Sequence, residues 1–79
     1  DGLSVHYYGN GQLDSKGTLK DGKLDGHWKY YWSNGKLNKK GDYKNGKKVG
    51  FWEIFNEDGS LEKTETWKND ERINCEGDC

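Results

Sequence analysis

The chain has 79 residues, with 13 basic and 14 acidic side chains, a net charge of −1, no proline and no methionine. This length allows a single domain, no apolar run is long enough to span a membrane, and a net acidic chain is a poor general binder of nucleic acid. Four Trp, five Tyr and two Phe are too many aromatic residues for a typical disordered segment.

Three tandem units of 24 residues follow one another without a gap, and such repetition is the first guide to the fold. We assign repeat 1 to residues 1–25, repeat 2 to 26–49 and repeat 3 to 50–73, with a Cys-containing tail at 74–79, all in one domain. The aligned columns include Asn10, Asn34 and Asp58; Gly11, Gly35 and Gly59; Leu13, Leu37 and Leu61; and Leu19, Tyr43 and Trp67. Repeat 1 has Ser4 in the column of Trp28 and Trp52. We interpret it as an atypical unit, either a terminal cap or a copy from a longer array.

Each unit contains two turn signals, as at Asn10-Gly11 and Asp21-Gly22 in repeat 1. Such pairs favour two-residue hairpin turns of type I′, in which both central residues have positive φ. Between the turns, residues 28–32 alternate aromatic and polar side chains with the period of a strand. Leu37 and Tyr43 have equal parity, so a regular strand places both on one face. We therefore predict an all-β fold, an elongated single-layer antiparallel meander of tandem β-hairpin repeats.

Residues 26–37 and 41–47 resemble a MORN-type repeat, and most closely the bacterial MORN variant. The shared pattern is G-x-W-x-x-Y-x-x-x-G-x-L followed by Y-x-N-G-K, and the likeness extends over residues 2–73. The resemblance implies a rod of β-hairpins. It also implies lipid contact, scaffolding and dimerisation, as in eukaryotic relatives, or the antitoxin label of many bacterial ones. The tandem aromatics are also similar to choline- and glucan-binding cell-wall repeats, although those units are shorter.

No serine lies in a nucleophile-elbow setting, and the glycines recur with turn spacing rather than as a phosphate-binding loop. We therefore predict a non-enzymatic module for protein–protein interaction or self-assembly. Its partner is another protein or a second copy, bound through the aromatic face, the sheet edges or both. The alternative is a module that binds sugar, choline or anionic lipid headgroups through exposed aromatics and a basic patch. The aromatic-face candidates are Trp28, Tyr30, Trp32, Tyr43, Trp52 and Trp67.

Charge is distributed unevenly along the repeats. Repeat 2 carries seven Lys against Asp42 alone, whereas repeat 3 carries seven acidic residues against two Lys and Arg72. Three interpretations remain open: lysines pair with acids across strands, the basic middle faces an anionic surface, or the acidic end of one molecule meets the basic region of another. The basic-patch candidates are Lys36, Lys39, Lys40, Lys44, Lys47 and Lys48.

Two cysteines, Cys75 and Cys79, lie after the last repeat. They form an intrachain disulfide that closes the end of the array, remain free or intermolecular thiols, or bind a metal. A metal site is disfavoured, because the spacing is not C-x-x-C and only His6 and His27 are available as histidine ligands. We predict no metal and no cofactor. A disulfide favours a secreted or periplasmic location.

Overall fold

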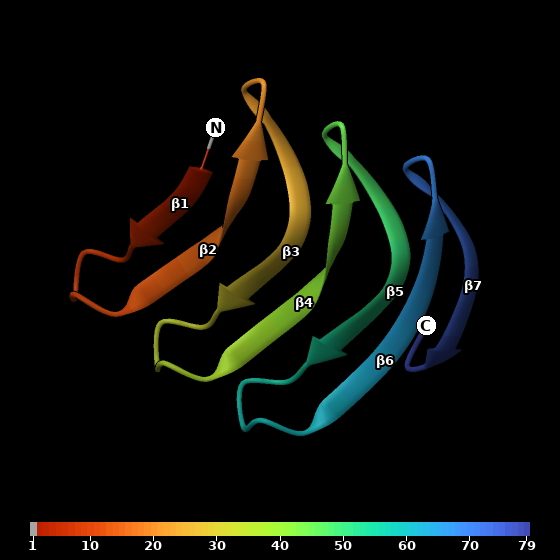
Figure 1. The fold of residues 1–79 in the computed structure, drawn as a ribbon. Coiled ribbons are helices and arrows are strands. Elements are labelled where there is room, and N and C mark those ends of the chain that lie inside the picture. Colours follow the sequence, from red (N-terminus) through yellow and green to blue (C-terminus); the bar gives the residue numbers. More distant parts are fainter. Residues whose placement is uncertain (1) are drawn as a thin grey trace.

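Seven β-strands form one antiparallel sheet in this computed structural model, which describes residues 2–79 (Figure 1). The strands are β1 (Gly2–Tyr7), β2 (Leu13–Lys20), β3 (Lys23–Tyr31), β4 (Leu37–Lys44), β5 (Lys47–Phe55), β6 (Leu61–Lys68) and β7 (Glu71–Gly77). Their order in the sheet is their order in the chain. The predicted all-β meander is confirmed, and residue 1 of the predicted repeat 1 lies outside the described residues. No helix in residues 2–79 is long and apolar enough to cross a membrane.

The turns that join β2 to β3, β4 to β5 and β6 to β7 lie at one end of the sheet (Figure 1). Both residues of each turn have positive φ, 52° and 77° for Asp21 and Gly22 and 53° and 81° for Asn45 and Gly46. This geometry confirms the predicted type I′ turns at this end. Such turns match the right-handed twist of the strands that they join.

At the opposite end the prediction of type I′ turns is wrong. In the first of these loops Gly11 has φ 88°, whereas Asn10 has no positive φ. Tyr8 N–H donates to the Gln12 carbonyl at 2.8 Å, and Gly11 N–H donates to the Tyr8 carbonyl at 3.0 Å. The loop therefore contains three residues. The additional residue lets the chain turn with a single left-handed glycine.

Irregularities in register interrupt every strand pair. Between β3 and β4, Tyr30 pairs with Lys39 but Tyr31 pairs with Leu37, so Asn38 is an additional residue on β4. The parity argument that places Leu37 and Tyr43 on one face does not extend across this bulge. Bulges also bend and twist the strands that contain them, and the longer strands are visibly curved (Figure 1).

The sheet is a single layer that measures 34 × 33 × 13 Å, so three repeats give a slab as wide as it is long. Directly paired residues of neighbouring strands project to the same side, and the register therefore defines two faces. The aromatic face carries Trp28, Tyr30, Tyr43, Trp52 and Trp67. The opposite side, which we call the charged face, carries Lys16, Lys29, Lys40, Glu53 and Glu76.

Candidate functional site

Two tryptophans form the core of the aromatic face. Trp28 and Trp52 are the buried apolar side chains of residues 2–79, with exposed fractions of 3% and 1%. Each indole ring covers a glycine of the preceding strand. A Cβ atom at Gly17 would lie 2.2 Å from a ring atom of Trp28, and one at Gly41 would lie 2.0 Å from a ring atom of Trp52. The absence of a side chain at these glycines is what permits a Trp to be buried in a single layer.

Tyr43 connects the two buried indoles. Its ring meets Trp28 and Trp52 edge to face, at centroid distances of 6.3 and 5.1 Å, and Tyr30 stacks beside Trp28 at 6.2 Å. The Tyr30 and Tyr43 hydroxyls are 3.0 Å apart, and burial together with this hydrogen bond raises the pKa of Tyr43. The four rings thus form one cluster across β3, β4 and β5, which holds successive hairpins together.

Lysine ammonium groups cover the outer surfaces of this cluster. Lys39 Nζ lies 4.8 Å from the centroid of Tyr30, and Lys48 Nζ lies 4.4 Å from that of Trp67 and 5.1 Å from that of Trp52. Burial, and then repulsion from Lys48, lower the pKa of Lys39. These are cation–π contacts made within the chain. The ring surfaces that a sugar or a choline headgroup would use are therefore already in contact with side chains.

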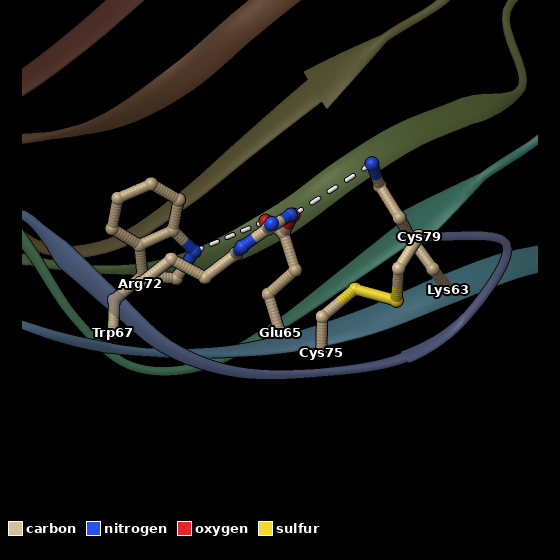
Figure 2. A network of polar contacts seen from close by, with 6 residues as sticks. All are labelled: Lys63, Glu65, Trp67, Arg72, Cys75 and Cys79. Carbon is tan, nitrogen blue, oxygen red and sulfur yellow. Dashed lines mark hydrogen bonds and ion pairs between the residues drawn. A yellow bond between two sulfur atoms is a disulfide. The ribbon is translucent and has the colours of Figure 1, made fainter.

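The repeat column that contains Gly17 and Gly41 has a carboxylate in its third position. Glu65 stands one repeat after Gly41, and Glu76 stands one repeat after Trp52. Trp67 Nε1 and Arg72 donate to Glu65 at 3.0 and 3.2 Å, and Lys63 Nζ lies at 3.7 Å (Figure 2). Where Gly17 and Gly41 are each covered by an indole ring, Glu65 is instead the centre of an ionic cluster.

Glu65 is ionised in this cluster although its exposed fraction is only 9%. Burial opposes ionisation of the carboxyl, but the hydrogen bonds from Trp67 and Arg72 and the charge of Lys63 prevail and lower its pKa. A buried carboxylate with several donors is stable, whereas the same group without them would be costly.

Trp32 lies outside the ring cluster, near the three-residue loops. Its indole N–H donates to the Phe55 carbonyl at 3.3 Å. At the tips of the first two loops, Asn10 Nδ2 donates to the Ser33 carbonyl at 3.0 Å, and Asn34 Nδ2 donates to the Glu57 carbonyl at 2.9 Å. These contacts connect each loop to the next, so the Asn column is structural.

The structure distributes the six predicted basic-patch lysines over several surfaces. Lys39 and Lys48 lie on the aromatic face, whereas Lys40 lies on the charged face and pairs with Glu53 at 3.4 Å. Lys36 Nζ donates to the Asp58 carbonyl at the loop end, and Lys44 and Lys47 flank the turn at the opposite end. These residues do not form one patch, because strand alternation and hairpin reversal separate them.

A different basic group, which the sequence did not reveal, lies on the charged face. Lys16 pairs directly with Lys29, and Lys29 pairs directly with Lys40, across β2, β3 and β4. The same line continues through Glu53 and Thr64 to Glu76 at β7. We call this line the charged row. Lys16 and Lys40 share a repeat column, but Lys29 belongs to another, so only the strand register brings them together.

A shallow pocket of about 270 Å³ lies on the charged face beside this row. Its lining includes His27, Lys29, Lys40, Asp42, Phe51 and Glu53. His27 Nδ1 is in contact with Asp42, and its side chain is largely exposed. Exposed apolar side chains lie on the same face, with exposed fractions of 73% for Leu3, 66% for Tyr7 and 56% for Phe51.

Cys75 and Cys79 are joined by a disulfide (Figure 2). Cys75 belongs to β7 and pairs with Glu65, so the strand continues into the segment 74–79. Asp78 N–H donates to the Glu62 carbonyl at 3.1 Å, which returns the chain end to β6. The disulfide thus fixes the segment beside the Glu65 cluster.

The MORN repeat variant model matches residues 1–21, 24–45 and 48–69. No curated protein and no solved structure matches. The three matched segments follow the hairpin period of the sheet and include most of the chain, and this protein therefore belongs to the MORN repeat variant family.

Proposed function

We propose that this chain is a protein-binding module that docks another protein, or a second copy, through its charged face and sheet edges. Repeats of this family are non-catalytic modules that bind proteins or membranes. One observation carries the proposal. The rings of the aromatic face contact one another and the lysines of the same chain, while Leu3, Tyr7 and Phe51 are exposed on the opposite face. Leu3 and Tyr7 lie on β1 and Phe51 lies on β5, with the lysines of the charged row between them, and exposed apolar side chains mixed with charged ones favour protein binding.

The sheet edges add a second mode of contact. An edge strand has a row of backbone N–H and C=O groups that can pair with a strand from a partner. A rigid single layer gives such a partner both an edge and a face. The aromatic cluster contributes rigidity to this scaffold rather than contact area.

The alternative function is recognition of a sugar, a choline group or an anionic lipid headgroup. The lysines over Tyr30, Trp52 and Trp67 argue against the first two ligands, because their ammonium groups lie where a cationic or stacking ligand would bind. The lysines of the charged row are the feature that favours an anionic headgroup.

A matched pair of variants tests the proposal. Phe51→Glu places a charge on the charged face, where Phe51 is 56% exposed, and His6→Glu places the same charge on the aromatic face, where exposed His6 pairs with Ser15. We expect a protein partner to be retained by the parent chain and by His6→Glu but lost with Phe51→Glu, in pull-downs at equal bait.

The alternative is tested with the same proteins. Choline, cello-oligosaccharides and phosphatidylserine vesicles are titrated while tryptophan emission is recorded. Unchanged emission agrees with the proposed protein-binding role. A saturable change in emission, together with unaltered protein retention by Phe51→Glu, would contradict it.

A further inference from the structure

The charged row has opposite charges in its two halves. Lys16, Lys29 and Lys40 occupy β2, β3 and β4, and Glu53 and Glu76 occupy β5 and β7. The row runs across the strands, along the direction in which the hairpins repeat (Figure 1). Neighbouring strands lie about 4.8 Å apart, so the charges from Lys16 to Glu53 follow one another at that spacing, and Thr64 separates Glu53 from Glu76.

The lysine half of the row is incompletely neutralised within the chain. Lys40 pairs with Glu53, but Lys16 and Lys29 have no acidic partner among residues 2–79. Like charges directly opposite each other on a sheet are destabilising. Two such pairs in succession, Lys16 with Lys29 and Lys29 with Lys40, are a cost that an external anionic group would offset.

The acidic half of the row offers such a group on a second copy of the chain. When the row is rotated by a two-fold axis between β4 and β5, Lys40 meets Glu53 of the second molecule and Lys16 meets Glu76. Lys29 meets Thr64, which carries no charge. A closed dimer requires a self-complementary surface of this kind.

We propose that the charged face binds a second copy of this chain, with the two charged rows antiparallel about a two-fold axis. The inference rests on the proposed function and specifies its partner. Facing sheets lie about 10 Å apart, a distance that Lys and Glu side chains can bridge between them. The contact is electrostatic and is therefore weakened by salt.

Two single charge reversals test the pairing. Lys16→Glu makes the row acidic at both ends, and Glu76→Lys makes it basic at both ends, so each variant repels its own copies. Mixed together, they restore both cross-copy pairs. Both positions are exposed, so neither change disturbs the core.

The measurement is sedimentation velocity at 20 mM and 500 mM NaCl. We expect dimers of the parent chain at low salt, at least a tenfold weaker association at high salt, monomers of each variant alone, and dimers in the equimolar mixture. Lys44→Glu and Glu71→Lys are controls with the same net charges but outside the row, and each is expected to dimerise like the parent chain.

A parent chain that is monomeric at low salt and high concentration would overturn the inference, as would row variants that dimerise alone or a mixture that stays monomeric. Anionic vesicles that bind a monomeric parent chain would show that the lysines face lipid instead. The proposed function fails separately, when Phe51→Glu retains its protein partner.

Discussion

At the scale of single residues, two glycines determine whether the aromatic core can form. The indoles of Trp28 and Trp52 occupy the space that a side chain at Gly17 or Gly41 would need. Close contact between a ring and the backbone replaces the second layer that ordinarily buries a tryptophan. The Gly–Trp pair is thus the unit of cohesion between one hairpin and the next.

Substitution of one of these glycines tests that role. Gly41→Ala would place a methyl group 2.0 Å from the Trp52 ring, and we expect a loss of about 3 kcal/mol in the free energy of unfolding. Gly9→Ala is the matched control, because a Cβ atom there meets nothing within 4 Å. Urea denaturation followed by tryptophan emission measures both. Equal stability of the two variants would contradict the assigned role.

Glu65 gives the molecule a pH dependence. Because its pKa is lowered on folding, its contribution to stability is present above the ordinary value of 4.5 and is lost as pH falls through the folded pKa. Glu65→Gln keeps an oxygen acceptor for Trp67 but removes the charge. We expect Glu65→Gln to be about 1–2 kcal/mol less stable at neutral pH, with a smaller loss on acidification. Parallel pH profiles of the two proteins would refute this.

At the scale of elements, asparagine side chains connect the three-residue loops. Asn34 has two functions: its Oδ1 accepts from Lys36 N–H at 2.9 Å within its own loop, and its Nδ2 donates to Glu57 in the next. Asp58 retains the first function, through Ser60 N–H at 2.9 Å, but has no donor for the second. The Ser60 hydroxyl and, after it, the Ser60 N–H donate to the Asp58 carboxylate and lower its pKa.

The exchange Asn34→Asp removes the donor to the next loop and keeps the acceptor within its own. We expect thermal or urea unfolding to show a loss of about 1 kcal/mol. The converse change, Asp58→Asn, gains no acceptor in a following loop and is expected to be neutral. A comparable loss in both variants would indicate that charge, not the connection between loops, determines the result.

Reduction of the disulfide is expected to act locally. The bridge closes a segment of only a few residues, so it constrains the unfolded chain little. It fixes Asp78 against Glu62 beside β6. We expect reduction to speed amide exchange at Asp78 and Cys79 while β3 to β5 keep their protection. Uniformly faster exchange over all strands would show that the bridge supports the whole sheet instead.

Sequence alone predicts the repeat, the strands and one of the two turn types, because these follow from local chemistry. The sequence also contains Gly17 and Gly41 in one repeat column, but it does not predict that an indole ring packs on each of these glycines. The charged row could not be predicted, since Lys16 and Lys29 meet through a register that the irregularity between Lys16 and Thr18 shifts. The six lysines of the predicted basic patch lie on different surfaces, because proximity in the sequence does not determine the face of the sheet on which a side chain lies.

At the scale of the whole molecule, the sheet is a linear array in which each hairpin contacts its neighbours. The third repeat ends the pattern at several positions at once: Asp58 replaces Asn, Glu65 replaces Gly and Glu76 replaces Trp. Glu65 and Glu76 thus stand where a Gly–Trp contact would join β6 to β7, and Asp58 lacks the amide donor that Asn34 uses.

The central claim is that indole rings lie against glycine backbone to form the core of a one-layer sheet. Proton NMR tests it directly, because protons beneath an indole ring are shifted upfield. We predict strongly upfield α-protons for Gly17 and Gly41, with nuclear Overhauser effects to the rings of Trp28 and Trp52 respectively, and none of this for Gly9. Ordinary glycine shifts at Gly17 and Gly41, without contacts to the rings, would contradict the account.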